Sequence, residues 1–406
     1  MADLDQILTA STAPGSNLVH GCVVAAVDKN GKQLFLQAAG RNGVSPDAPP
    51  ANVDATFWIA SCSKLIGTIA ALQCVERGQI TLDEPVDKIL PELSSPKVFV
   101  DPEGDSFDTR PADKKITLRH LLCHNSGLAY DLFTPKMLAW RQSRGESPLT
   151  FSGSCGQAHT TPLLYEPGEG WSYSGGVDLS RNQNADYRHK WAGELVARLN
   201  KTTLEKYFQT HIFKPLGMTS TTFRLEKHPE IKNRLLGTAE RDQDGTLKDS
   251  VKLWPDHAAE DCSGAGLYSS VGDYIRVLGD LIKDEPTLLR KETVAKEMFT
   301  AQLPHDSASL KVLLKGGAIV EAMAGTNGVS RGINWGLGGL LTEEDVGALA
   351  KGTLAWGGMP NLVWMMNKEK GVAAIFASQM VPPGDVNCRK LVSEVFQEAY
   401  RLSPTS

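Results

Sequence analysis

A serine and a lysine, Ser61 and Lys64, lie three positions apart in the segment 57–64, which reads FWIASCSK. Apolar residues then recur at helical spacing, which predicts a helix over 64–77 with Gly78 as its terminating glycine. Positions i and i+3 share one face of a helix, with Cβ atoms roughly 5–6 Å apart, so the lysine amine can reach the serine hydroxyl. A nearby amine activates a serine, and backbone N–H groups of the first turn stabilise developing negative charge. The pair therefore indicates acyl transfer through a serine.

The S-x-x-K spacing is weak evidence by itself. The same spacing occurs at Ser94 and Lys97, where Pro96 makes a helix implausible. A serine at the start of a helix is also a common N-cap, which is a purely structural role. The catalytic hypothesis for Ser61 therefore depends on the rest of the chain.

Three further segments have the composition and order of catalytic motifs. Residues 116–128 read ITLRHLLCHNSGL, residues 167–174 read PGEGWSYS, and residues 355–360 read AWGGMP. The first two resemble the ITxRHLLxHxSGL and PGxxxxYS motifs of the serine β-lactamase and penicillin-binding-protein-like superfamily. The third resembles the third element of that family in its Trp-Gly-Gly form. Over about residues 20–400 the chain resembles the class C β-lactamase-like branch, with its acyltransferases and Trp-Gly-Gly carboxylesterases.

The resemblance implies a role for each residue of the site. Tyr173 becomes the catalytic partner of Ser61 and Lys64, and it accepts the serine proton. The Lys64 ammonium favours the deprotonated tyrosine, because a nearby opposite charge favours an ionised form. The backbone N–H groups of Ser61 and Met359 form the oxyanion hole. Substrate binding is expected at Trp356, Gly357 and Gly358. No metal or cofactor is implied.

The third element also bears on the substrate. β-Lactamases and peptidases of the superfamily typically carry Lys-Thr-Gly there, where the lysine attracts the carboxylate of the substrate. Trp356 supplies no such charge, which favours small apolar esters or thioesters. The expected partners are therefore a small-molecule ester or thioester, with an alcohol acceptor or an acyl-carrier donor as further possibilities. Hydrolysis and transfer stay open, because both run through one acyl-enzyme.

Two other functions remain as alternatives. The first is a β-lactamase or D-amino-acid peptidase-like hydrolase. The second is a catalytically silent binding protein on the same scaffold. Gly175 keeps the second alternative open, because class C members carry Tyr-x-Asn and the asparagine is missing here. The polar segment 179–190, LSRNQNADYRHK, has no counterpart in the acyltransferase pattern, and it could displace Tyr173.

Other short motifs are interpreted as coincidental. The G-x-S-x-G pattern at 328–332 centres on Ser330, but an α/β-hydrolase needs a later histidine and the last of the nine histidines is His305. His120 and His124 are four apart on a predicted helix, with no glutamate in the zinc-protease position and no evident third ligand. A packed histidine pair is therefore expected there.

Composition limits the class of protein further. The 406 residues carry a net charge of −5, with 42 basic and 47 acidic residues, so nucleic acid is not an expected partner. We find no apolar run near the roughly 18 residues of a membrane span and no secretory signal, so a cytoplasmic protein without a membrane partner is expected. The seven cysteines are scattered, which argues against a disulfide framework and favours buried apolar positions.

The predicted elements give an α/β (α+β) fold. An Asn-Gly turn within 21–40 predicts a hairpin. Further strands are predicted at 335–342, 352–356, 362–367 and 372–379, helices at 116–122, within 191–213 and at 386–402, and a loop at 101–114. We therefore expect an antiparallel sheet built from both chain ends and flanked by helices, with an inserted mainly helical region. The sheet domain would comprise residues 1–95 and 260–406, and the helical domain residues 96–259.

Overall fold

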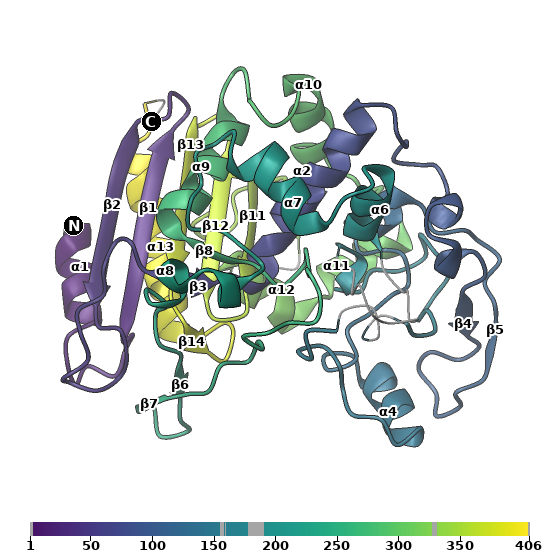
Figure 1. Cartoon of the computed structure of the whole chain (residues 1–406), viewed down its shortest axis with the longest axis horizontal. Helices are drawn as coiled ribbons and strands as arrows, with labels where there is room; N and C mark the ends of the chain where they lie inside the picture. Colours follow the sequence, from purple (N-terminus) through teal and green to yellow (C-terminus); the bar gives the residue numbers. More distant parts are fainter. Residues whose placement is uncertain (1–2, 155–157, 159, 178–190, 327–330, 405–406) are drawn as a thin grey trace.

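An antiparallel sheet assembled from the two ends of the chain forms the centre of the structure (Figure 1). The structure is a computed structural model that describes residues 3–154, 158, 160–177, 191–326 and 331–404. The strand order is β2-β1-β13-β12-β11-β10-β9. The strands are β1 (Gly21–Asp28), β2 (Gln33–Gly40), β9 (Ile333–Gly336), β10 (Gly339–Thr342), β11 (Thr353–Gly358), β12 (Leu362–Asn367) and β13 (Val372–Ala377). The predicted fold class is confirmed.

Strand β1 is buried on both faces, and its side chains alternate between two hydrophobic clusters. Val24 and Ala26 pack with residues of α1 (Leu4–Ser11) and α13 (Val386–Arg401). Val23 and Ala25 pack in the cluster that includes α2 (Ser63–Glu76) and α9 (Val271–Ile282). Because successive side chains of a strand point to opposite faces, helices on both sides bury β1, whereas the edge strand β2 is only partly buried. In Figure 1 the purple strands β1 and β2 stand beside the yellow strands β12 and β13.

The remaining elements lie outside this sheet, and in Figure 1 α4, β4 and β5 lie at the side of the molecule opposite β1 and β2. The other α-helices of the described residues are α3 (Leu118–Leu122), α4 (Pro135–Ser143), α6 (Ala192–Leu199), α7 (Leu204–Phe208), α8 (Pro229–Lys232), α10 (Lys291–Thr293), α11 (Ala308–Leu314) and α12 (Gly317–Ala324). The other strands are β3 (Thr56–Trp58), β4 (Lys97–Phe99), β5 (Thr109–Pro111), β6 (Ala239–Arg241), β7 (Leu247–Asp249), β8 (Tyr268–Ser270) and β14 (Met380–Val381). The domain boundaries at 95/96 and 259/260 stay a prediction.

Several predicted elements are confirmed. The hairpin at 21–40 is β1 and β2, the helix at 64–77 is α2, and the C-terminal helix is α13. Gly78 has φ +69°, as a terminating glycine requires. Helix α3 begins after Thr117, because the Thr117 side chain accepts a hydrogen bond from the His120 backbone N–H.

Two predictions were wrong in detail. The segment 335–342 is not one strand: it contains the end of β9, a turn at 337–338 and all of β10, and β9 and β10 pair with each other. Gly338 has φ +103° there, so the chain reverses at a position that only glycine adopts easily. The expected loop at 101–114 contains β5, which pairs with β4. A three-residue strand that ends in proline gives no clear alternation, so the sequence pattern did not indicate it.

The cysteines are mostly buried thiols, as expected. Five are free and buried, namely Cys22, Cys62, Cys74, Cys123 and Cys388. Burial raises the pKa of Cys22 and of Cys123 to about 12, so both thiols stay protonated and unreactive. Cys262 is disulfide-bonded, which the scattered spacing did not indicate. Cys155 lies outside the described residues.

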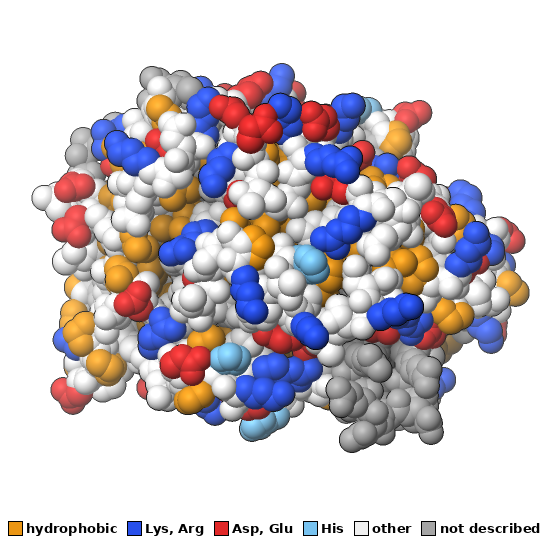
Figure 2. All heavy atoms as spheres, turned by 45° about the horizontal axis from the view of Figure 1, so that its top comes forward, with side chains coloured by type: hydrophobic (Ala, Val, Ile, Leu, Met, Phe, Trp, Pro, Cys, Tyr) orange, Lys and Arg blue, Asp and Glu red, His pale blue; other side chains and the backbone are white. Residues whose placement is uncertain are grey.

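The surface mixes charges of both signs. Figure 2 shows Lys and Arg side chains interspersed with Asp and Glu over the face in view. This mixture agrees with the near balance of 42 basic and 47 acidic residues. Within the described part of the chain, no helix is both long enough and apolar enough to span a bilayer.

His20 makes the stability of the fold dependent on pH. Its Nε2 lies 2.9 Å from the carbonyl oxygen of Gly237, and its Nδ1 lies 3.2 Å from the sulfur of Met380. Burial lowers the pKa of His20 from 6.5 to about 4, against the smaller opposing effect of the Gly237 carbonyl. Below pH 6.5 the unfolded chain therefore takes up a proton that the folded chain does not. The stabilisation is present above about pH 6.5 and is lost as the pH falls toward 4.

We expect wild-type protein to lose about 2 kcal/mol of unfolding free energy through His20 between about pH 7.5 and pH 5. His20→Gln removes the titrating group and keeps a donor for Gly237. Urea unfolding at both pH values should therefore show a smaller pH dependence in the variant, by about that amount. An equal pH dependence in the two proteins would show that His20 does not control this loss.

Candidate active site

Ser61 lies in a 3-10 turn, Ala60–Cys62, directly before α2. Ala60 has φ +43°, a left-handed conformation that a residue with a Cβ rarely adopts. Such strain persists only where the surroundings hold it in place. Here the hydroxyl of Tyr274, on α9, donates a hydrogen bond of 2.8 Å to the Cys62 carbonyl. The turn therefore gives Ser61 a fixed position.

Lys64 connects Ser61 with the rest of the site. Its Nζ lies 3.3 Å from Ser61 Oγ, 2.8 Å from the Tyr130 hydroxyl and 2.8 Å from the Gly264 carbonyl oxygen. The same Nζ lies over the ring of Tyr173, 4.8 Å from its centroid. The exposed fractions of Ser61, Lys64 and Tyr173 are 8%, 3% and 7%. The three predicted catalytic residues therefore come together in a site that is largely shielded from water.

The Tyr173 hydroxyl has a donor that the sequence did not indicate. Trp356, on β11, donates a hydrogen bond of 3.0 Å from Nε1 to this oxygen, and the two ring centroids lie 5.2 Å apart. Trp356 itself is only 1% exposed. Its observed contact is therefore with Tyr173, whereas substrate binding by Trp356 stays a prediction. The Lys64 amine, in contrast, lies over the face of the Tyr173 ring.

Tyr130 and Gly264 are the site residues that the sequence analysis missed. Tyr130 stands two residues after the SGL motif, and its hydroxyl accepts a hydrogen bond from Lys64. Gly264 offers only a backbone carbonyl, which no side-chain motif could reveal. A tyrosine near a motif is more often a core residue, so Tyr130 gave only a weak signal. Together the two residues hold the Lys64 amine in place.

His124 supports the segment that carries Tyr173. Its Nδ1 lies 3.3 Å from the Ser174 backbone nitrogen, which donates, and its ring lies 4.9 Å from that of Tyr173. The predicted helical pair with His120 is wrong, because α3 ends at Leu122 and His124 has φ +59°. His120 instead belongs to the N-terminal cap of α3. Among the described residues, no group of three His, Cys, Asp or Glu side chains could hold a metal.

The glycines of the third element allow a close approach of two backbones. A Cβ on Gly358 would overlap the carbonyl oxygen of Ile59, two residues before Ser61. A Cβ on Gly357 would lie 2.5 Å from the Leu362 carbonyl oxygen. Both contacts are with backbone atoms, which cannot move aside as a flexible side chain can. The end of β11, and with it Met359, can therefore lie beside the turn of Ser61.

Gly358→Ala should lower kcat/KM for an aryl ester by about 100-fold, because displacing catalytic groups by about 1 Å has effects of that size. The added methyl must push β11 away from the serine turn. Gly352→Ala is a control in which the added Cβ would meet only Glu369 Oε2, at 4.0 Å, although its positive φ makes it a strained substitution. Steady-state kinetics and melting temperatures of both variants test this expectation. A fully active Gly358→Ala enzyme would show that the close approach is not required.

The remaining sequence candidates lie elsewhere. Ser94 and Lys97 are both exposed, after a 3-10 turn and in β4. Gly175 begins the 3-10 turn Gly175–Val177, and Tyr173 keeps its place beside Lys64. The polar segment 179–190 and Ser330 lie outside the described residues. The predictions made for both therefore stay predictions.

The chain matches the family model described as Beta-lactamase over residues 16–395. It therefore belongs to the β-lactamase family. Its fold and its named relatives define it as an enzyme that transfers acyl groups or cleaves esters on the serine β-lactamase scaffold.

Similar proteins include transferases and an esterase. Acyltransferase calJ of Penicillium decumbens is 35% identical, with 97% of this chain and 96% of the relative covered. Lovastatin esterase of Penicillium rubens is 32% identical, with 97% of both chains covered. The solved structure of unliganded simvastatin synthase from Aspergillus terreus has a TM-score of 0.86 and 30% identity, with all of both chains covered.

Proposed function

We propose that this enzyme transfers an acyl group through Ser61, with Tyr173 as general base and Lys64 as the cation that keeps Tyr173 deprotonated. One observation carries the proposal: Lys64 Nζ lies 3.3 Å from Ser61 Oγ and 4.8 Å from the Tyr173 ring centroid. Lys64 directs its three donors at Ser61, Tyr130 and Gly264. An ammonium used in this way has no lone pair for the serine proton. Tyr173 is therefore the better base.

Each half of the reaction passes one proton through Tyr173. Ser61 Oγ gives its proton to the Tyr173 oxygen and attacks the carbonyl carbon of an ester or thioester. The backbone N–H groups of Ser61 and Met359 stabilise the resulting oxyanion. The leaving group departs with the proton held by Tyr173, and the acyl group stays on Ser61. In the second half, water or an alcohol gives its proton to Tyr173 and takes the acyl group, and Tyr173 passes that proton to the departing Ser61 Oγ, which restores both residues.

Trp356 supports this proton transfer. A phenolate oxygen is stabilised by a hydrogen-bond donor, and the Trp356 Nε1 donates to the Tyr173 oxygen at 3.0 Å. The indole carries no charge, so it supplies the donor without attracting a substrate carboxylate. This arrangement disfavours β-lactams and peptides, whose carboxylates the lysine of a Lys-Thr-Gly element would bind.

The substrate class that fits best is a small ester or thioester with an apolar acyl or alcohol group. Aromatic rings extend outward from the site, with centroid distances of 5.9 Å from Tyr130 to Phe133 and 6.0 Å from Phe133 to Phe151. Phe133 is exposed, so this row offers an apolar surface to a substrate. Relatives named for cleaving lovastatin and for synthesising simvastatin support a small-molecule ester. An acyl-carrier thioester as donor stays a prediction.

A partition experiment tests the proposal. The enzyme is incubated with p-nitrophenyl butyrate, with and without a primary alcohol, and butyric acid and butyrate ester are measured. We expect the alcohol to divert product from acid to ester, because both arise from one acyl-enzyme. A cephalosporin with a chromogenic leaving group should not be hydrolysed at a comparable rate.

Two serine variants control this experiment. Ser61→Ala should lose formation of both acid and ester, whereas Ser94→Ala, the other S-x-x-K serine, should keep both. The proposal is wrong if Ser61→Ala retains wild-type turnover. Faster cleavage of the cephalosporin than of the ester would instead support the β-lactamase alternative.

A further inference from the structure

A buried asparagine holds the turn that follows the third element. Asn361 has φ +56°, a left-handed conformation that asparagine tolerates better than most residues. Its Nδ2 donates to the carbonyl oxygens of Met380 and Pro382, each at 2.8 Å. Its Oδ1 accepts from the backbone nitrogens of Gly384 and Asp385 at 2.9 and 3.1 Å. The amide therefore makes four hydrogen bonds to one segment, 380–385.

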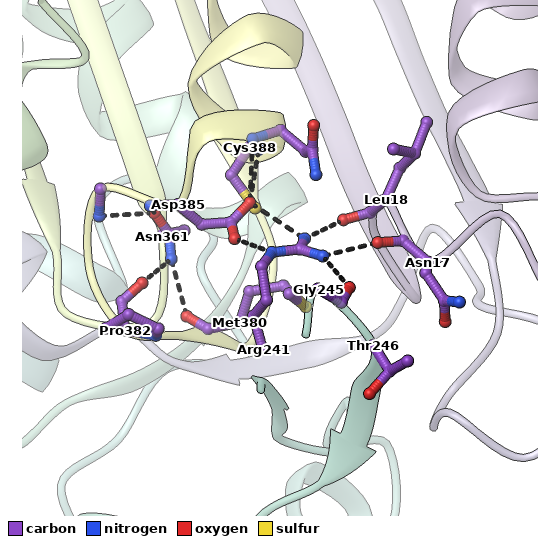
Figure 3. A network of polar contacts seen from close by, with 12 residues as sticks. Asn17, Leu18, Arg241, Gly245, Thr246, Asn361, Met380, Pro382, Asp385 and Cys388 are labelled. Atoms are coloured by element: carbon purple, nitrogen blue, oxygen red, sulfur yellow. Dashed lines mark hydrogen bonds and ion pairs between the residues drawn. The ribbon is translucent and has the colours of Figure 1, made fainter. Parts of the chain in front are cut away.

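That segment is in turn held by an ion pair, shown in Figure 3. The Asp385 carboxylate accepts from the backbone nitrogens of Asn387 and Cys388, which begin α13. It is also paired with the guanidinium of Arg241, on β6. Arg241 further donates to the carbonyl oxygens of Asn17, at 2.6 Å, and of Leu18. Asn361 is thus attached to a rigid junction of β6, α13 and the N-terminal segment.

Met359 lies between this junction and the nucleophile. On one side Gly358 contacts the Ile59 carbonyl, next to the turn of Ser61. On the other side stands Asn361, and the Met380 backbone nitrogen donates to the Pro360 carbonyl at 3.2 Å. The Met359 backbone is therefore fixed from both directions.

We propose that Asn361 is a positioning residue for the oxyanion hole, acting through the backbone of Met359. The inference rests on the proposed function, which assigns the second oxyanion donor to Met359. An oxyanion donor acts only if it is held in position before the reaction, because reorganisation during the reaction would offset its effect. Glycine could adopt the conformation of residue 361 but would make none of the four bonds. Aspartate could accept but not donate. The asparagine amide meets both requirements.

If Asn361 had a purely structural role, replacing it would lower the stability of the protein and would lower the rates for all substrates equally. The two roles are separated by comparing an ester with its thionoester, in which sulfur replaces the carbonyl oxygen. Sulfur is larger and a weaker hydrogen-bond acceptor, so an oxyanion hole accelerates the thionoester much less. Loss of the hole therefore lowers turnover of the oxygen ester selectively.

The test is Asn361→Gly in the full-length chain, assayed with a p-nitrophenyl ester and the matching thionoester. We expect kcat/KM for the ester to fall by about 100-fold, chiefly through kcat, since removing an oxyanion donor costs about that much or more. The kcat/KM for the thionoester should fall by less than about 10-fold. Asn367→Gly is the matched control, because Asn367 is a buried asparagine at the far end of β12 whose amide makes three hydrogen bonds, against four for Asn361. It should leave the ratio of the two rates unchanged.

A second variant covers the case in which Asn361→Gly does not fold. Arg241→Met removes the ion pair with Asp385 and leaves Asn361 in place. It should lower kcat/KM for the ester by about 5-fold more than kcat/KM for the thionoester. Equal losses on ester and thionoester, or a ratio equal to that of Asn367→Gly, would overturn the inference. That result is distinct from failure of the proposed function, which would appear as retained activity in Ser61→Ala.

Discussion

Replacing Lys64 with methionine is expected to lower kcat/KM for an aryl ester by about 1,000- to 10,000-fold, the upper part of the range for acid–base catalysis. Lys64 is the residue that contacts both the nucleophile and the ring of the proposed base. Without the ammonium, the proposed base Tyr173 loses the positive charge beside its ring, so transfer of the serine proton to it should slow. Acylation and deacylation should both slow, because Tyr173 acts in each half.

The variant should still fold. Methionine fills similar space, and removing a desolvated charge offsets part of the loss of hydrogen bonds to Tyr130 and Gly264. Stopped-flow and steady-state kinetics measure the two half-reactions, and Lys97→Met is the control from the exposed S-x-x-K pair. A folded Lys64→Met enzyme within about 10-fold of wild type would contradict the assigned role.

Removing the Tyr173 hydroxyl is expected to have the next largest effect on the rate. Comparison with removal of the Tyr130 hydroxyl decides which tyrosine is the general base. Tyr173→Phe should lower kcat by about 1,000-fold, because the variant has no group to receive the serine proton. Tyr130→Phe should lower kcat by only about 10-fold, because it removes one of three partners of the Lys64 amine. The two substitutions are matched, since each deletes one buried hydroxyl beside the same lysine.

The opposite order of effects would make Tyr130 the base. That outcome is a real test, because the direct hydrogen bond from Lys64 goes to Tyr130 at 2.8 Å while Tyr173 is approached through its ring. Melting temperatures must accompany the rates, since Tyr173→Phe leaves the buried Trp356 N–H without its acceptor. Such a group costs about 1–3 kcal/mol, so a lower melting temperature is expected in that variant.

Local chemistry made part of the site predictable from the sequence. The spacing of Ser61 and Lys64 is a property of one helical turn, so it could be derived without knowing the fold. Strands β12 and β13 were predictable because each is a short apolar run and a turn joins them. Helix α13 was predictable because its apolar residues recur at helical spacing. Tyr173 required the family resemblance, since nothing local connects it with a serine 112 residues earlier.

The contacts that were missed are all long-range or conformational. Gly264 meets Lys64 through a carbonyl oxygen, which every residue possesses. The bond from Trp356 to Tyr173 spans 183 positions, and it depends on how β11 lies against the helical region. His124 lies beyond the end of α3 in a left-handed conformation, which the spacing of the two histidines cannot reveal.

We propose that a neutral donor, Trp356, in place of a charged lysine at the third element suits this scaffold to another substrate class. A lysine there would both stabilise the tyrosine oxygen and attract a carboxylate. Trp356 keeps the hydrogen bond to Tyr173 and, together with Trp335, makes the surroundings apolar. On this proposal the geometry for activating the serine is retained, and the attraction for anionic substrates is lost.

The most direct test of the account is the identification of the acylated residue. The enzyme is mixed with an excess of p-nitrophenyl butyrate, quenched in acid within milliseconds, digested and analysed by mass spectrometry. The account predicts one butyryl group on the peptide that contains Ser61, and its loss when an alcohol is added before the quench. A butyryl group on any other residue at the same rate, or turnover by Ser61→Ala, would contradict it.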